Sequence, residues 1–309
     1  MRVVVVGAGA IGTLLAARLA AHGHAVTVVA RAATVPALRH GGLTIEGEPG
    51  PVRVDAVASL PEPSAFDAAV LAVKTFDLEA AAEALARAVR PPVPLLLVQN
   101  GLGVEAVVER ALQRGGWSHP ASWTVRAVNS LPATWIGPGE VRAGGTGEVV
   151  LPGGSGPGGT PVDRFAALLG TSGISVRLVD DLATELWRKA IVNGAINPLT
   201  AIGGVENGAL LAAPWRARAM TLLHEAVRAA RASGIPVTER EAEADWERVV
   251  RATAANRSSM LQDLDRGRPT EIDAISGAIL AAGAAHGLDL PATRAIVADV
   301  RARARPQPS

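Results

Sequence analysis

The feature that most constrains this fold is a glycine-rich turn at residue 7 of the chain. Four valines, Val3–Val6, lead directly into Gly7-Ala8-Gly9-Ala10-Ile11-Gly12, and an Ala/Leu-rich stretch follows. An unbroken β-branched run predicts a strand that is buried on both faces. The stretch Ala10–Ala21 predicts a helix that ends before Gly23. A strand, a tight turn and a helix in this order predict the first βα unit of a parallel sheet.

The spacing of the three glycines is typical of a dinucleotide-binding turn. Gly7 permits the tight turn, Gly9 lets the backbone approach a pyrophosphate, and Gly12 allows the helix to pack closely on the strand. The helix N-terminus also favours the negative charge of a phosphate. A tight turn without a ligand is the alternative, but packing alone hardly explains three glycines at this spacing. The cofactor-binding residues expected in this turn are Gly7, Ala8, Gly9, Ala10, Ile11 and Gly12.

The residues after the second expected strand favour NADP(H) over NAD(H). An NAD site usually places an acid about 20 residues after the turn, where it binds the ribose 2′-hydroxyl. Here the strand Ala25–Val29 is followed by Arg31, and the first acid after the turn is Glu46. Arg31 is suited to pair with a 2′-phosphate and to stack on the adenine. A solvated loop arginine is the alternative in so arginine-rich a chain.

Strand and helix patterns alternate through the first half of the chain, which predicts an α/β fold with helices on both faces of a parallel sheet. Further strands are expected at Val52–Val57, Ala68–Val73 and Val93–Val98, and helices at Leu78–Val89 and Val104–Leu112. From Thr124 to Val179 the pattern is mostly strand, with a long glycine turn at Gly153–Gly159 and a short helix at Val162–Leu169.

The character of the sequence changes near Asp180. Only helices are expected beyond it, at Leu182–Ala201, Leu210–Ser233, Glu239–Arg266 and Ile272–Gly287, with a frayed tail at Arg301–Ser309. We therefore expect a Rossmann-type dinucleotide-binding domain at residues 1–180 and an all-α substrate and catalytic domain at residues 181–309.

Composition excludes several other classes of protein. The 309 residues carry a net charge of +1, which gives no electrostatic reason to expect a nucleic acid or a membrane surface as a partner. With no cysteine, disulfides, thiolate metal ligands and a cysteine nucleophile are excluded. His22 and His24 lack acidic partners nearby, so no metal site is expected. No signal-peptide core or membrane-length apolar run occurs, and we expect a cytoplasmic protein.

Lysine is rare in this chain and its positions are informative. Of thirty basic residues only Lys74 and Lys189 are lysines, and the others are arginines. Where arginine is so favoured, a lysine that persists can indicate a need for a compact ammonium that releases a proton. Chance survival is the alternative.

Lys189 begins a polar stripe on an otherwise apolar helix. Lys189, Asn193 and Asn197 are spaced four residues apart and therefore share one helix face. A surface pair between Lys189 and Glu185 is the alternative for the lysine, but it explains neither asparagine. The stripe predicts a face turned toward a partner or a polar cavity.

Three further segments complete the expected site. Lys74-Thr75 and Gln99-Asn100-Gly101 follow expected strands, at the carboxyl ends where open α/β sheets bind ligands. Turn formation is the alternative for Asn100-Gly101. The third segment runs from Asn256 to Asp273; within it, Thr270 and Asp273 are expected to form a capping box, with Glu271 at the first helical position.

With these residues in place, the chain resembles the ketopantoate reductase (2-dehydropantoate 2-reductase) family, and the likeness covers nearly the whole chain in the family's order. It rests on GAGAIG at the start, VKTFD around Lys74, QNGLG around Asn100, LWRKAIVNGAINPLTAI around Lys189 and NRSSMLQDLDRGRPTEID around Glu271. The last two motifs are long and specific.

The resemblance implies a role for each matching position. Lys189 matches the catalytic general acid, and Glu271 matches the acid at the hydroxyl end of the substrate, which supports the catalytic arrangement. Arg31 and Lys74 match cofactor-contacting positions, and Asn100 sits where the nicotinamide ribose meets the substrate. The substrate-contacting positions are matched by Asn193, Asn197, Asn207 and Ser259, the serine helping to hold the carboxylate.

The implied activity is NADPH-dependent reduction of 2-dehydropantoate to (R)-pantoate in pantothenate and coenzyme A biosynthesis, with a small 2-oxo acid as partner; a homodimer is one compatible assembly. Two alternatives stay open: a reductase of another 2-oxo acid or ketone, and a non-catalytic NADP-binding sensor. One segment fits the family less well, because residues 127–132 are not glycine-rich and the bulky Trp135 follows.

Overall fold

The computed structural model describes residues 1–153 and 159–304, and the chain divides into two compact units. The first unit comprises Met1–Gln99 and Val104–Leu182. The second comprises Asn100–Gly103 and the residues from Ala183 onward. The short segment 100–103 therefore belongs to the second unit, although both of its neighbours in sequence belong to the first.

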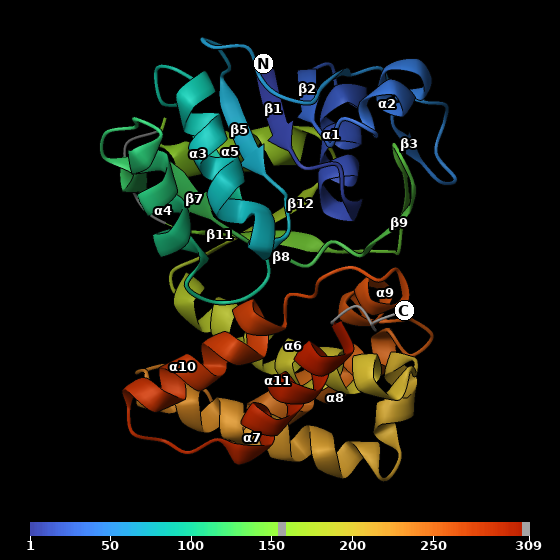
Figure 1. The fold of residues 1–309 in the computed structure, drawn as a ribbon, viewed down its shortest axis with the longest axis vertical. Coiled ribbons are helices and arrows are strands. Elements are labelled where there is room, and N and C mark those ends of the chain that lie inside the picture. The colour runs from blue at the N-terminus through green and yellow to red at the C-terminus, as the bar shows by residue number, and fades with distance from the viewer. Residues whose placement is uncertain (154–158, 305–309) are drawn as a thin grey trace. The chain divides into compact units, whose positions relative to one another are not determined.

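A six-stranded sheet forms the centre of the first unit (Figure 1). Every neighbouring pair of its strands is parallel. In spatial order the strands are β4 (Asp55–Val57), β2 (Ala25–Val29), β1 (Arg2–Val6), β5 (Ala68–Leu71), β6 (Leu95–Leu97) and β7 (Thr124–Arg126). The first strand thus lies at the centre and the order reverses beside it, as in the Rossmann fold. The predicted fold class is confirmed.

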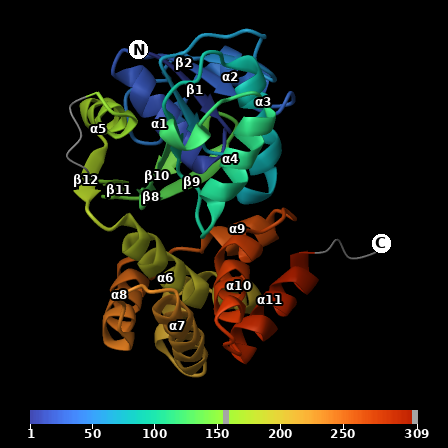
Figure 2. The ribbon, with the colours of Figure 1, turned by 90° about the vertical axis from the view of Figure 1, so that its left-hand side faces the viewer.

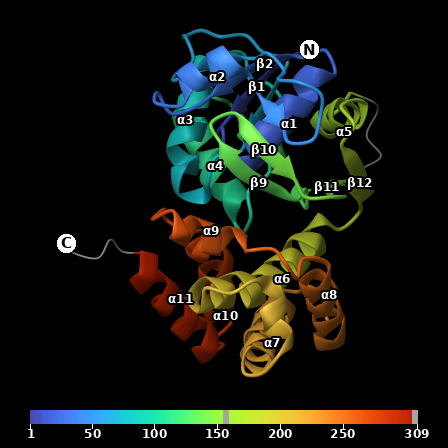
Figure 3. The same ribbon diagram turned by 90° about the vertical axis from the view of Figure 1, so that its right-hand side faces the viewer.

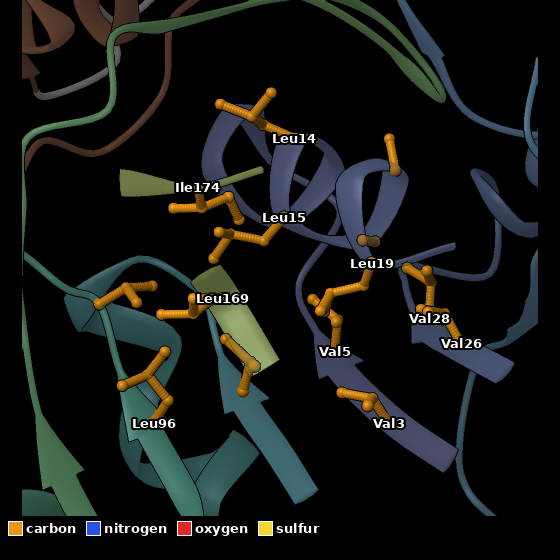
Figure 4. Packing of buried hydrophobic residues seen from close by; sticks show 14 of the residues in the cluster. Val3, Val5, Leu14, Leu15, Leu19, Val26, Val28, Leu96, Leu169 and Ile174 are labelled. Carbon is orange, nitrogen blue, oxygen red and sulfur yellow. The ribbon is translucent and has the colours of Figure 1, made fainter. Parts of the chain in front are cut away.

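The valine run of β1 contributes to the hydrophobic packing on both faces of this sheet. Val3 and Val5 pack in one core cluster, whereas Val4 and Val6 pack in another, because successive side chains of a strand point to opposite faces. Figure 4 shows Val3 and Val5 beneath the leucines of the first helix. All four valines are almost fully buried, as the run predicted.

Four helices of the first unit cover the two faces of the sheet. Leucines and alanines of α3 and α4 share a cluster with Val4 and Val6, and Figure 2 shows these two helices side by side. Residues of α1 and α5 share the other cluster with Val3 and Val5. The helices are α1 (Ala10–Ala21), α3 (Leu78–Ala88), α4 (Val104–Arg114) and α5 (Pro161–Thr171).

Helix α1 is buried around most of its circumference because a second, smaller sheet packs on its outer side. That sheet consists of β3 (Thr44–Ile45), β10 (Glu140–Ala143) and β9 (Ala133–Gly137), and Figure 3 shows β9 and β10 next to α1. A helix that is apolar on all sides is typical of such a position between two layers. A third sheet contains β12 (Ser175–Val179), β11 (Glu148–Pro152) and β8 (Val128–Asn129).

The regular secondary structure of the second unit consists of helices in the part that the structure describes. Its core is formed by one face of α6 with α7, α8 and α10. The helices are α6 (Leu182–Gly203, of which Leu182 lies in the first unit), α7 (Trp215–Ala232), α8 (Glu239–Ala252), α9 (Ser259–Asp265), α10 (Ala278–Ala285) and α11 (Pro291–Ala304). A 3₁₀ turn, η3 (Asn207–Leu211), precedes α7, and a π-turn, η4 (Asp273–Gly277), precedes α10.

Two helix predictions for the second unit were wrong in their bounds. The helix expected at Leu210–Ser233 is split, because Pro214 lacks the N–H that a continuous helix needs. The helix expected at Glu239–Arg266 is broken before Ser258, whose hydroxyl accepts the Leu261 N–H and starts α9 anew.

The third correction concerns the end of the chain. The capping box expected at Thr270 and Asp273 is not formed; Asp273 instead pairs with Arg301 at 2.6 Å. This ion pair belongs to a tail that was expected to fray, but Arg301 lies within α11, which continues to Ala304. The rest of the expected tail, residues 305–309, and the centre of the turn at 153–159 lie outside the described residues.

Two helices escaped prediction, namely α2 (Val35–Gly41) and α11. Helix α11 begins at Pro291, and its first N–H groups are capped from far away in sequence. The buried carboxylate of Glu225 on α7 accepts the N–H groups of Ala292 and Thr293 at 3.0 and 2.7 Å. A capping group that is supplied by another helix leaves no local signal.

The contact between α1 and β1 gives the first prediction. A Cβ added at Gly12 would lie 1.8 Å from the Gly7 carbonyl oxygen, which no side chain can accommodate without backbone movement. We expect Gly12→Ala to lower the free energy of unfolding by about 1–3 kcal/mol or more, as overpacking does. Denaturant unfolding measures this, with Gly41→Ala as a control because no atom lies within 4 Å of its added Cβ. Equal stability of Gly12→Ala and the parent would contradict the account.

Candidate functional site

The glycine turn lies where the strand order of the main sheet reverses. Gly7 follows β1 with φ +112°, and an added Cβ would lie 2.8 Å from the carbonyl carbon of Ala72, just after β5. The Gly7 N–H donates to the Val29 carbonyl at the end of β2 (2.9 Å). The turn is thus held against the carboxyl ends of both neighbouring strands, where open α/β sheets bind their ligands.

The N-terminus of α1 is suited to a phosphate. Gly9 is the N-cap residue and provides no side-chain cap, and the first turn of the helix carries no acid. The first N–H groups of a helix have no partner within the helix and carry its positive dipole end. No atom lies within 4 Å of a Cβ added at Gly9, so the backbone here is open to a close approach. These features fit a pyrophosphate.

Arg31 follows β2, as expected, but it has a partner that sequence reasoning missed. Its guanidinium lies 3.3 Å from the carboxylate of Asp77, in an ion pair exposed to solvent. Asp77 occupies the N-cap position of α3, yet its side chain makes no capping hydrogen bond. An acid therefore faces Arg31 after all, supplied by the segment after β5 instead of β2. The position of Asp77 in the VKTFD motif, three residues after Lys74, is the sequence signal that could have identified it.

Lys74 lies just beyond the carboxyl end of β5 and is half-buried. The neighbouring Gln99, which is buried, braces this segment from the end of β6. Its side-chain amide donates to the carbonyls of Leu71 (2.8 Å) and Val73 (3.2 Å). The two segments that were expected to form part of the site are therefore joined directly, because parallel strands end at the same edge of a sheet.

The polar stripe of the second unit lies on α6. Lys189, Asn193 and Asn197 fall within this one continuous helix and share a face, as their spacing predicted. Lys189 and Asn193 are half-buried and Asn197 is buried. A buried amide such as that of Asn197 is a cost to folding unless it hydrogen-bonds, whereas Lys189 and Asn193 are partly open to solvent.

The residue before the lysine fixes α6 to its neighbour. The Arg188 guanidinium lies 2.7 Å from the carboxylate of Asp245 on α8, and this hydrogen-bonded acid raises the pKa of Arg188. Consecutive helix residues point about 100° apart, so this pair holds α6 from a different side than the stripe. Arg188 and Lys189, although adjacent and both basic, therefore have different surroundings.

Asn100 and Glu271 lie together within the second unit although 171 residues separate them. The Asn100 side-chain amide donates to the Glu271 carboxylate at 3.4 Å, and Glu271 is only 6% exposed. A buried carboxylate needs partners of this kind. The structure thus brings together two residues that the sequence placed in the site from separate motifs.

Ser259 and Asn207, by contrast, form no hydrogen bond with these residues in the part of the chain that the structure describes. Ser259 is exposed at the first position of α9, while its neighbour Ser258 is buried, caps that helix and accepts a hydrogen bond from Thr200 (2.7 Å). The Asn207 amide donates to the Thr253 hydroxyl at 2.8 Å. Its buried carbonyl oxygen has no hydrogen-bond partner within the described residues. Substrate contact by Ser259 and Asn207 stays a prediction.

The segment from residue 127 to Trp135, which departs from the family pattern, contributes one strand to each of the two small sheets. Val128 and Asn129 form β8, and the Asn129 side chain accepts the Leu131 N–H at 3.1 Å. Trp135 is half-buried in β9.

Within residues 1–153 and 159–304, no helix combines the length and hydrophobicity that crossing a membrane requires, and no cluster of three or more potential metal ligands occurs.

Two family models match the chain and together span most of it. One described as "Ketopantoate reductase PanE/ApbA" matches residues 3–156, and "Ketopantoate reductase PanE/ApbA C terminal" matches residues 181–304. Among curated proteins, the 2-dehydropantoate 2-reductase of Halobacterium salinarum is 33% identical, with 97% of this chain and 98% of the relative covered. The enzyme of the same name from Vibrio cholerae is 32% identical, with 97% of each chain covered.

Solved structures resemble the whole chain as well. A PanE/ApbA family ketopantoate reductase from Ralstonia eutropha is 29% identical and superposes with a TM-score of 0.86, covering 98% of both chains. A D-mandelate dehydrogenase, solved with NADH and anilino(oxo)acetate, is 25% identical and has a TM-score of 0.89 over 98% of both chains.

The open backbone at Gly9 gives a prediction that separates binding from folding. Its φ of −79° suits any L-residue and an added Cβ meets no atom, so we expect Gly9→Ala to unfold like the parent. The same methyl group would stand between the backbone and a pyrophosphate, and we expect affinity for NADPH to fall at least tenfold. A fluorescence titration with NADPH measures this. Unchanged NADPH affinity in a folded Gly9→Ala variant would remove the turn from the cofactor site.

Proposed function

The chain belongs to the ketopantoate reductase family, and from this premise we propose that it catalyses the NADPH-dependent reduction of 2-dehydropantoate to (R)-pantoate in pantothenate and coenzyme A biosynthesis. The observation that carries the proposal is that the polar residues of the expected site are grouped in the second unit. One compact unit holds the lysine and both asparagines of the α6 stripe together with the Asn100–Glu271 pair. These are the side chains that a carbonyl reductase needs for a proton and for orientation.

We assign the two units different tasks. The first unit, corresponding to residues 1–180, is the NADP-binding domain, and the helical second unit, corresponding to residues 181–309, is the substrate and catalytic domain. The loop 100–103 is the exception, because the structure groups it with the second unit. Asn100 is thereby counted with the catalytic residues, as its proposed place beside the nicotinamide ribose and the substrate requires.

The preference for NADPH rests on Arg31. Its exposed guanidinium is available to a 2′-phosphate, which it can bind through two hydrogen bonds, and no acid occurs between β2 and Glu46. Lys74 adds a second positive charge at the end of β5. The carboxylate of Asp77 opposes this preference, since it repels a phosphate and can accept a hydrogen bond from a 2′-hydroxyl. We propose that the attraction of a 2′-phosphate to the positive charges of Arg31 and Lys74 exceeds its repulsion by the carboxylate of Asp77.

When bound, the nicotinamide supplies the hydride, and the residues of this chain handle the charge and the proton. Reduction of a ketone builds negative charge on its oxygen. The Lys189 ammonium stabilises this charge and donates the proton that completes the alcohol. An arginine offers the same charge but is a very weak acid, which explains a lysine at position 189 in a chain whose basic residues, Lys74 apart, are otherwise arginines.

The other polar residues orient the substrate without donating protons. Asn193 and Asn197 follow Lys189 along α6 and add hydrogen bonds but no charge. Glu271 is proposed to accept a hydrogen bond from the hydroxyl end of the substrate and to support Lys189, while Ser259 and Asn207 are proposed to contact the substrate. Hydrogen-bonding groups that are held rigidly keep a bound substrate in the orientation in which it reacts, which raises the rate.

The likeness to D-mandelate dehydrogenase favours a second candidate, a reductase of another 2-oxo acid. That protein shares the fold over 98% of this chain, and its ligands are NADH and anilino(oxo)acetate, a carboxylate with an aromatic ring. A larger or aromatic 2-oxo acid would be the substrate in that case, and Asp77 would favour NADH. A non-catalytic NADP-binding sensor is less well supported, because it needs neither Lys189 nor the Asn100–Glu271 pair.

A substrate panel tests the proposed activity. We expect ketopantoate to give the highest kcat/KM among branched, linear and aromatic 2-oxo acids, assayed by NADPH and NADH oxidation. Negligible turnover of ketopantoate beside efficient turnover of an aromatic 2-oxo acid would favour the second candidate. No turnover of any compound, despite tight NADPH binding, would favour the sensor.

Replacing the proposed general acid by a residue of equal charge isolates the proton. We expect Lys189→Arg to retain the fold and NADPH affinity but to lose about 10²–10⁴-fold in kcat, the usual contribution of one general acid. Lys74→Arg is the matched comparison, and its loss should be smaller because only a positive charge is required there. Near-normal kcat in Lys189→Arg would exclude Lys189 as the proton donor.

The cofactor assignment is tested by opposite charge changes at one ion pair. We expect Arg31→Ala to weaken NADPH binding roughly tenfold, as the loss of a charged hydrogen bond does, while NADH binding changes little. Asp77→Asn should shift the ratio of the two affinities the other way, toward NADPH. Dissociation constants for both cofactors provide the measurement. Equal weakening of NADPH and NADH by Arg31→Ala would contradict the 2′-phosphate assignment.

A further inference from the structure

The loop 100–103 is held by the π-turn η4, and this contact is independent of the side chains already assigned. The Leu102 N–H donates to the carbonyl of Ala274 at 3.1 Å. Ala274 lies within η4, where the wider turn interrupts the regular α-helical pattern of hydrogen bonds. A carbonyl in such a turn is well placed to accept a hydrogen bond from outside the helix.

Gly101 is the residue that permits this approach. Its φ of +90° is strained for any residue with a side chain, and an added Cβ would lie 2.2 Å from the Ala274 carbonyl oxygen. Ordinary contacts of a Cβ begin at 3.4 Å, so the loop and the turn would have to separate by about 1.2 Å. No other residue type fits the observed contact.

The same contact fixes the distance between two proposed catalytic residues. Asn100 lies two positions before Leu102, and Glu271 lies three positions before Ala274. Their side chains meet at 3.4 Å, so the two backbone segments, the Leu102–Ala274 hydrogen bond and the Asn100–Glu271 contact form a closed ring. The Ile275 N–H donates to the Glu271 carbonyl at 3.1 Å, which ties Glu271 to the π-turn from within.

Both sides of the ring are anchored in hydrophobic cores. The Leu102 side chain packs against the core of the second unit that contains α6, α7 and α8. Ile272 and Ile275 are almost fully buried in a neighbouring cluster with α9 and α11. The π-turn also contacts α6 at Gly194, where an added Cβ would lie 3.8 Å from the Ser276 hydroxyl oxygen. The ring is therefore a rigid part of the unit that holds Lys189.

From this geometry we propose that Gly101 is a positioning residue: it lets the loop 100–103 dock on the carbonyl of Ala274, and this docking sets the placement of Asn100 against Glu271. The consequence for catalysis rests on the proposed function, whereas the docking itself does not. A displacement of about 1 Å in a group that positions a substrate can cost on the order of 10²-fold in rate.

The chain supplies a matched control for the experiment. Gly103 also has a positive φ, +70°, but no atom lies within 4 Å of an added Cβ. Both Gly101→Ala and Gly103→Ala therefore place a side chain at a positive φ, but only Gly101→Ala adds the collision with Ala274. Leu102→Ala is a third variant, which weakens the anchoring of the loop without any collision and guards against loss of folding in Gly101→Ala.

Hydrogen exchange of the Leu102 amide, measured by NMR, reports the docking without any substrate. We expect exchange to be slow in the parent and in Gly103→Ala, faster in Leu102→Ala, and fastest in Gly101→Ala. In parallel, kcat for the 2-oxo acid that the parent reduces best should fall about 10²-fold in Gly101→Ala, with a smaller change in KM, and should stay near the parent value in Gly103→Ala.

The two readouts distinguish the failure of this proposal from that of the proposed function. A Leu102 amide that exchanges freely in the parent, or equally in both glycine variants, overturns the docking. Lost protection with an unchanged kcat in Gly101→Ala overturns the positioning role while the proposed function stands. A parent that reduces no 2-oxo acid refutes the proposed function and with it the positioning role of Gly101 in catalysis, although the amide measurement still decides whether the loop docks.

Discussion

The first unit depends on the contact between the start of α1 and the end of β1. An added methyl group at Gly12 would lie 1.8 Å from the Gly7 carbonyl oxygen, so the helix can lie this close only because residue 12 has no side chain. This approach places the N-terminus of α1 at the point where the strand order reverses. The open helix N-terminus at the turn, the placement of Arg31 after β2 and that of Lys74 after β5 all follow from a sheet built around β1.

The second unit differs from the first in that it holds polar side chains within or beside a core formed by helices. The helix α6 that carries the polar stripe packs its apolar side chains into the core of this unit, and Arg188 anchors it to Asp245 from another side. Glu271 is buried beside Asn100, which reaches it through a loop docked on a π-turn. Rigid backbone supports of this kind are what the roles proposed for Lys189 and its neighbours require, since geometry at the reacting atoms determines the rate.

The sequence predicted those parts of the molecule whose signals are local. The valine run, the three spaced glycines and the four-residue spacing of Lys189, Asn193 and Asn197 each follow from the periodicity of one strand or helix, and each was confirmed as structure. The contacts that escaped prediction join distant segments: Asp77 with Arg31, Glu225 with the start of α11, and Ala274 with Leu102. No periodicity records such pairs. Pro214, in contrast, was a local signal for a helix boundary, and the helix expected at Leu210–Ser233 was wrong because it ran through this proline.

The central claim is that Lys189 gives a proton to the oxygen of a 2-oxo acid that this chain reduces. A crystal structure of the protein with NADP⁺ and (R)-pantoate tests it most directly. The account predicts that the Lys189 Nζ lies within roughly 2.7–3.2 Å of the pantoate hydroxyl oxygen, the range of a hydrogen bond. A complex in which pantoate is bound and another donor occupies that position, with Lys189 turned away, would contradict it.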